Sequence, residues 1–172
     1  MASANWRTIG ETVGLLAIVA SLIFVGFELQ QDQTLARSEL ASDGFNRMSD
    51  IAESLTDPEF ATIYAKMLEQ PEQLTRTEMI QVNAFLTLVT DLMARECYLA
   101  QRGVYVECDY LMRDSIRRYF GNAYAQNWWR VADTRPNVEL PEWVDEEISN
   151  ASSDAELRRL DSIRQELGKD KK

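Results

Sequence analysis

The chain has 172 residues, of which 45% are hydrophobic and 27% are charged, a composition typical of a folded protein. Its formal charge of -10 argues against a nucleic-acid partner, because affinity for phosphate backbones depends on clustered Lys and Arg. It contains no histidine, which excludes a Ser-His-Asp triad, a Cys-His dyad and the histidine-dependent zinc and di-iron sites. It also lacks the glycine-rich motifs that bind nucleotide phosphates. We therefore predict no catalytic, cofactor-binding or metal-ligating residue and no cofactor.

An uncharged apolar run covers residues 13–27 and is bracketed by Glu11 and Glu28. Extended to 9–29 it reaches about 20 positions, which matches the roughly 30 Å of a hydrocarbon core at 1.5 Å per residue. The sequence therefore predicts a single transmembrane helix, an N-terminal membrane anchor over residues 1–30, and a lipid bilayer as one partner.

Two other interpretations compete with the membrane span. A cleaved signal peptide needs a site of small residues after the apolar run, whereas Phe27, Glu28 and Leu29 stand there. A buried helix of a soluble bundle can also be apolar. However, this run is apolar on every face, and the remaining chain is hardly large enough to surround it.

Small residues recur along the apolar run at Gly10, Gly14, Ala17 and Ser21, with spacings of four, three and four. This spacing places them on one helix face, where two backbones can approach closely in a membrane. We expect this face to pack on a second copy of the chain, as a homo-oligomer, or on a membrane-protein partner.

The first helix is expected to continue beyond the anchor, because no proline occurs between Glu28 and Pro58. An apolar stripe with helical spacing indicates that it joins a helical bundle. The predicted stripe consists of Ala41, Phe45, Met48, Ala52 and Leu55.

Helix-start signals define the next two helices. Asp57 before Pro58 can cap free N–H groups, so a helix begins there and ends before Pro71. Thr75 and Glu78 form a capping box, with Leu74 and Met79 as its hydrophobic staple. The apolar positions of the two helices are Phe60, Ile63, Tyr64, Met67 and Leu68, then Val82, Phe85, Leu86, Val89, Leu92, Met93 and Cys97.

The third helix is expected to stop at Gly103, and it carries Glu96 within its apolar stripe. A carboxylate there must be paired or have a raised pKa. We expect an ion pair with an arginine of the next helix, with a functional acid as the alternative.

A fourth helix is predicted from about Glu107 to Phe120, antiparallel to the third because their link is short. Gly121 and Asn122 then separate it from a helix that ends at Pro136. The inner positions are Cys108, Leu111, Met112, Ser115, Ile116, Tyr119 and Phe120 in the fourth helix, and Tyr124, Trp128, Trp129 and Val131 in the fifth.

The C-terminal part is expected to form two short acidic helices. The first covers residues 141–148, and a capping box of Ser153 and Glu156 starts the second, which carries Leu157, Leu160, Ile163 and Leu167. We therefore predict an all-α protein, in which one transmembrane helix continues into an antiparallel helical bundle over residues 31–136. An acidic helical segment with a disordered tail follows over residues 137–172.

Five aromatic residues are candidates for a ligand pocket or an interface: Tyr98, Tyr105, Tyr110, Trp128 and Trp129. For the paired tryptophans, a lid on the core is the favoured interpretation over a ligand platform or a membrane-interface anchor.

The two cysteines, Cys97 and Cys108, are too few for a disulfide scaffold, and we expect small buried residues that stay unbonded. Arg7 precedes the span and acidic residues follow it, which favours a cytoplasmic N-terminus and a soluble domain on the periplasmic side.

The stretch WRTIGETVGLLAIVASLIFVGFELQQ at residues 6–31, the helix start at residues 57–60 and the Asn-Trp-Trp at 127–129 resemble a widespread uncharacterised bacterial family. Its members are small membrane proteins with a single span and a helical domain. The resemblance covers residues 6–130 and implies the bacterial cytoplasmic (inner) membrane, but no activity and no site residues.

These features favour a membrane-anchored interaction or accessory protein, either a subunit of a membrane complex or a homo-oligomer. The alternative is a ligand-sensing helical domain that binds an apolar or aromatic small molecule beside the five aromatic residues. An enzyme is the third hypothesis, since only carboxylates such as Glu96 are available as acid or base.

Overall fold

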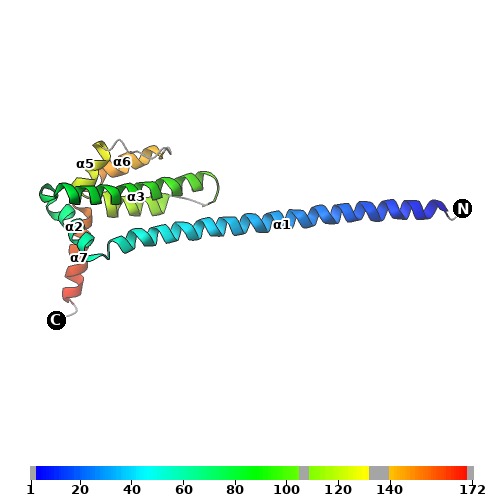
Figure 1. The fold of residues 1–172 in the computed structure, drawn as a ribbon, viewed down its shortest axis with the longest axis horizontal. Helices are drawn as coiled ribbons and strands as arrows, with labels where there is room; N and C mark the ends of the chain where they lie inside the picture. The colour runs from blue at the N-terminus through cyan, green and yellow to red at the C-terminus, as the bar shows by residue number, and fades with distance from the viewer. Residues whose placement is uncertain (1–2, 105–108, 132–139, 170–172) are drawn as a thin grey trace. The chain divides into compact units, whose positions relative to one another are not determined.

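The computed structural model describes residues 3–104, 109–131 and 140–169, and the chain divides into two compact units, Met1–Asp43 and Gly44–Lys172 (Figure 1). The described residues are all-α and contain no strand, as predicted. Their elements are α1 (Ser3–Ser54), α2 (Pro58–Glu69), the 3₁₀ turn η1 (Pro71–Gln73), α3 (Arg76–Gln101), α4 (Asp109–Ser115), the π-helical η2 (Ile116–Phe120), α5 (Ala123–Val131), α6 (Glu142–Asn150) and α7 (Ala155–Lys169).

Helix α1 has 52 residues and runs through the apolar segment and the polar segment that follows, as expected from the absence of proline. Its last turns, from Gly44 on, belong to the second unit. Here the predicted stripe is wrong in part, because Phe45 is 68% exposed and Ala52 is also exposed. Of the predicted residues, Ala41, Met48 and Leu55 are partly buried, and the fully buried positions are Gly44 and Ile51, which were not predicted. A neighbouring stripe of the same helical period faces the core.

Both predicted helix starts are confirmed. The Asp57 side chain accepts a hydrogen bond of 2.8 Å from the Phe60 N–H, which caps α2. At α3 the Thr75 hydroxyl accepts from the Glu78 N–H at 3.3 Å, and Glu78 accepts from the Thr75 N–H at 2.6 Å. Leu74 is buried beside this start, whereas its predicted staple partner Met79 is 41% exposed.

The core of the second unit is organised by α3. Its predicted stripe is buried except for the partly buried Leu92. Phe85 is central, since the rings of Phe60, Tyr64 and Tyr119 lie 5.2, 5.6 and 5.7 Å from its centroid. Aromatic pairs at these separations add to the stabilisation from apolar burial.

Helix α3 ends at Gln101, and Gly103 has a φ of 72°, a conformation that glycine adopts without strain. Helix α4 then lies alongside α3 (Figure 1), where the Cys97 Sγ–H donates to the Met112 Sδ at 3.1 Å. The antiparallel pairing is as expected. Of the two cysteines, Cys97 is a buried free thiol and Cys108 lies outside the described residues.

The predicted helix 107–120 is not α-helical throughout, because its last turn, η2, is a π-helix. Two carbonyl groups of η2 are bound by side chains. The Tyr64 hydroxyl donates to the Arg118 carbonyl at 3.4 Å, and the Asn122 side chain donates to the Tyr119 carbonyl at 2.9 Å. Asn122 also accepts from the Ala125 N–H at 2.8 Å and so starts α5, as predicted.

Helices α5, α6 and α7 complete the second unit. Trp128, Trp129, Val144 and Ile148 join the core, whereas Val131 is 81% exposed and is not an inner residue.

The predicted capping box at Ser153 is wrong. Helix α7 begins at Ala155, and both carboxylate oxygens of Glu156 accept hydrogen bonds from Arg159. The Ser152 hydroxyl donates instead to the Asp154 carboxylate, which holds the pKa of Asp154 below its usual value.

Candidate functional site

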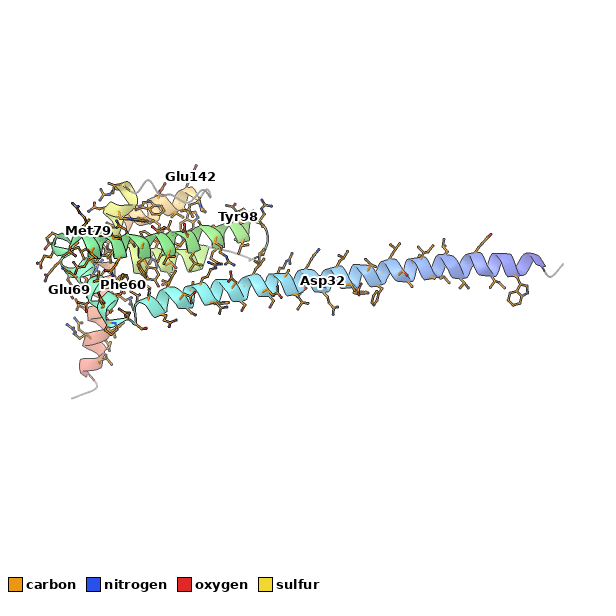
Figure 2. All side chains as sticks on the ribbon, in the orientation of Figure 1. Asp32, Phe60, Glu69, Met79, Tyr98 and Glu142 are labelled. Atoms are coloured by element: carbon orange, nitrogen blue, oxygen red, sulfur yellow. The ribbon has the colours of Figure 1, made fainter. Side chains whose placement is uncertain are left out.

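The largest apolar surface in the described chain is the first part of α1. Every large apolar side chain from Ile9 to Leu29 is at least 46% exposed, and Figure 2 shows side chains projecting on every side of this helix. Its most apolar window has a mean hydropathy of 2.2 with 0% of the window buried. A soluble protein rarely exposes so large a contiguous apolar patch. By length and composition, this one helix could cross a membrane.

The small-residue face lies on this exposed segment. Gly10, Gly14, Ala17 and Ser21 are all exposed. A Cβ added at Gly10 or Gly14 would meet nothing within 4 Å, so both positions have open space beside them.

The same face becomes acidic where α1 leaves the apolar segment. Glu28, Asp32, Glu39 and Asp43 are exposed and follow Ser21 at intervals of seven, four, seven and four residues. At 100° per residue, they lie with the four small residues in an arc of about 80°. Leu35, which is 62% exposed, lies at the edge of this arc. We call Glu28, Asp32, Glu39 and Asp43 the acidic stripe. Between residues 28 and 43 the sequence has one cation, Arg37, which is on the opposite side of the helix, and Arg47 follows Asp43 by about one helical turn.

The predicted aromatic residues do not form one patch in the part of the chain that the structure describes. Trp128 and Trp129 are buried, with their rings 6.4 and 5.5 Å from that of Phe120, which makes them part of the core. Trp129 also donates through Nε1 to the Asp145 carboxylate at 2.8 Å.

Tyr98 is 42% exposed near the end of α3 (Figure 2), with the Arg102 guanidinium 5.1 Å from its ring centroid. Tyr105 lies outside the described residues, and the side chain of Tyr110 is likewise not described.

Glu96 is paired, although with a different partner from the one expected. Its carboxylate accepts a hydrogen bond of 2.7 Å from Arg95, the preceding residue of α3, and not from an arginine of the next helix. A pair between adjacent residues gives this carboxylate a structural explanation that needs no second catalytic group.

A buried polar cluster lies at the start of α7 and is not predicted from the sequence. Glu156 is 5% exposed and receives hydrogen bonds of 2.7 and 2.6 Å from Arg159. These bonds raise the pKa of Arg159, and burial followed by the charge of Glu156 raises the pKa of the Tyr64 hydroxyl. The cluster links α7 to α2 and η2. Only the i,i+3 spacing of Glu156 and Arg159 could have indicated it from the sequence.

A second ionic group joins η2 and α4 to α6. Glu147 pairs with Arg113 and lies 3.7 Å from Arg117, while the Arg113 guanidinium lies 4.4 Å from the ring centroid of Trp143. Among residues 3–104, 109–131 and 140–169, no group of three or more His, Cys, Asp or Glu side chains is placed to hold a metal ion.

Comparison of the chain with protein-family models, with curated proteins and with solved structures found no match.

Proposed function

We propose that this chain is a membrane-anchored helical protein whose role is interaction, either as an accessory subunit of a membrane complex or as a homo-oligomer. The observation that carries the proposal is the apolar segment of α1, whose most apolar window is 0% buried among the described residues. In water this surface would drive aggregation, whereas a bilayer covers it completely. The second unit has a core of its own and so supplies a folded domain for contacts with other proteins.

The membrane in this proposal is the bacterial cytoplasmic membrane, which α1 crosses once, with the second unit on the periplasmic side. Arg7 lies close before the span, whereas the first cation after it is Arg37, and this supports the orientation because positive charge is retained on the cytoplasmic side.

Interaction is favoured over a soluble catalytic role because α1 presents a face for close helix packing. Gly10, Gly14, Ala17 and Ser21 leave room for a second backbone, and in lipid such packing replaces the hydrophobic effect as the force that associates helices.

The anchor is tested by membrane extraction at alkaline pH. The wild-type chain should stay in the membrane pellet, and Val19→Arg, near the middle of the apolar segment, should be released to a large extent. An arginine at a helix centre disfavours insertion by about 3 kcal/mol, which corresponds to roughly a hundredfold in the insertion equilibrium. Val131→Arg, on an exposed site of α5, is the matched control and should behave as wild type. Release of the wild-type chain would refute the anchor.

The interaction is tested by blue-native electrophoresis after extraction in mild detergent. We expect a species larger than the monomer, which Gly14→Leu should shift toward the monomer because its side chain blocks close approach. Val19→Leu adds bulk on the opposite side of α1 and should leave the migration unchanged. Migration of the wild-type chain as a monomer under every condition would contradict the proposal.

A further inference from the structure

Helix α7 leaves the core before it ends. Glu156 is 5% exposed and Leu157 is partly buried, but Leu160, Ile163 and Leu167 on the same side of the helix are 43, 47 and 66% exposed. Figure 1 shows this later part of α7 extending beyond α2 within the second unit. The three apolar residues, which we call the α7 stripe, therefore lack a covering partner within the described part of the second unit.

The α7 stripe lies in a basic part of the chain. Residues 158–172 contain six Lys or Arg and three Asp or Glu, a net charge of +3, whereas the whole chain carries -10. Arg159 and Arg164 lie on either side of the stripe at 100° per residue. Because Arg159 is bound to Glu156, Arg164 is the cation of this pair that can face a partner, and such a strip fits a surface that combines exposed apolar atoms with negative charge.

The acidic stripe of α1 has this chemistry. Four exposed carboxylates follow one side of the helix, and the exposed Leu35 lies three residues after Asp32 and four before Glu39. We propose that the α7 stripe of one chain docks on the acidic stripe of α1 in a second copy of the same chain, with Leu160, Ile163 and Leu167 around Leu35 and Arg164 beside the carboxylates.

This contact is small, so we expect it to form only between two chains that are anchored in the same membrane. Three partly exposed apolar side chains cover far less than the roughly 800 Å² per partner of a stable soluble interface. Two anchored chains are held in one bilayer at a high effective concentration, so a weak contact suffices. In a two-fold pair the contact forms twice, since each α7 docks on the other chain. The inference thus rests on the proposed membrane anchor.

Cysteine crosslinking of full-length chains in neutral phosphatidylcholine vesicles tests the contact. One chain carries Leu35→Cys and one epitope tag, the other carries Ile163→Cys and a second tag, and oxidation should give a species that contains both tags. Gln165→Cys faces away from the α7 stripe, and Thr34→Cys points about 100° away from Leu35. Using Gln165→Cys in place of Ile163→Cys, or Thr34→Cys in place of Leu35→Cys, should therefore lower the crosslink yield several-fold. The unmodified chain, with Cys97 and Cys108, gives the background.

A charge exchange tests the specificity of the contact. Arg164→Glu should lower the crosslink yield by roughly fivefold, as expected when an exposed ion pair is reversed, and high salt should lower it similarly. Glu39→Lys in the partner should restore the yield. Arg159 is unsuitable for this exchange because it binds the buried Glu156.

Several outcomes would overturn the proposal. Equal crosslinking of Ile163→Cys and Gln165→Cys, or no rescue by the charge exchange, would exclude docking on the acidic stripe. If two Ile163→Cys chains crosslink mainly to each other, the α7 stripe packs against the α7 stripe of a second chain. If crosslinking stays at the background level and a fluorophore attached to Ile163→Cys responds only to anionic phospholipid, the α7 stripe binds lipid instead. Chains that fail to resist alkaline extraction would instead refute the anchor, which is measured before crosslinking begins.

Discussion

Gly121 is a position in the second unit where the structure leaves no room for a side chain. A Cβ added there would lie 2.3 Å from the Arg117 carbonyl oxygen and 2.9 Å from the Ala155 Cβ. The first contact is with backbone of the π-helical turn, and the second is with the start of α7. Neither atom is the end of a flexible side chain, so Gly121→Ala must displace η2, α7 or both.

The expected loss of stability for Gly121→Ala is about 3 kcal/mol, at the upper end for overpacking because backbone must move. The second unit has roughly 130 residues, for which 1 kcal/mol corresponds to about 4 °C in Tm. We therefore expect Tm to fall by about 12 °C. Gly103→Ala is the matched control, because its Cβ would meet nothing within 4 Å and only its φ of 72° is unfavourable. That conformation costs about 1 kcal/mol, or about 4 °C.

Thermal unfolding in mild detergent, followed by tryptophan fluorescence, measures both variants, because Trp128 and Trp129 are buried in the second unit. The double variant Gly121→Ala/Ala155→Gly should recover part of the loss, since it removes the contact with α7 but not the one with Arg117. Equal Tm values for the two single variants would refute the packing of η2 against α7.

Three further predictions concern the same unit. Phe120→Ala should lower stability by about 4 kcal/mol in urea unfolding because this fully buried ring contacts both tryptophans, while the exposed Val131→Ala should stay within about 0.5 kcal/mol of wild type. Trp129→Phe should cost about 1 kcal/mol in the same assay by removing the hydrogen bond to Asp145, and an unchanged midpoint would argue against that bond. The hydrogen bond from Lys66 lowers the pKa of Glu78 from 4.5 to about 2, so the charged form stabilises the fold above pH 4.5 and this contribution is lost as the pH falls toward 2. The difference in unfolding midpoint between wild type and Glu78→Gln should therefore narrow over that range, and a constant difference would contradict the pairing.

Local signals were sufficient to predict most of the fold. The caps at Asp57 and Thr75 depend on residues within one turn, so sequence and structure agree there. The stripe of α3 was also predictable, because its period determines which side is apolar. In the last turns of α1, however, two interleaved stripes have the same period. The choice between Phe45 and Ile51 is made by the core that α2 and α3 supply.

The remaining differences have separate causes. The π-helical turn depends in part on a long-range contact, the hydrogen bond from the Tyr64 hydroxyl to the Arg118 carbonyl, and in part on the nearby Asn122 amide. The capping pattern at Ser153 is present in the sequence, but the buried Glu156 binds Arg159 instead. The aromatic candidates for a ligand pocket or an interface share only their residue type, and the structure separates the exposed Tyr98 from the buried tryptophans.

The acidic stripe limits how two copies of α1 can associate. If two parallel copies pack through Gly10 and Gly14, their stripes face each other at the point where the helices leave the lipid. Helices that pack through small residues cross at about 40° and diverge, so repulsion is strongest at Glu28 and Asp32, nearest the crossing. This repulsion would weaken association through α1 alone unless cations lie between the helices. The basic end of α7 can supply them. Truncation of residues 164–172 keeps the bond between Arg159 and Glu156, and it should weaken association at low salt but have a smaller effect at high salt, where the carboxylates are screened. Sedimentation of the reconstituted or detergent-solubilised chain at two ionic strengths measures this. An equal loss of association at both ionic strengths would show that α7 does not act through the negative charge of α1.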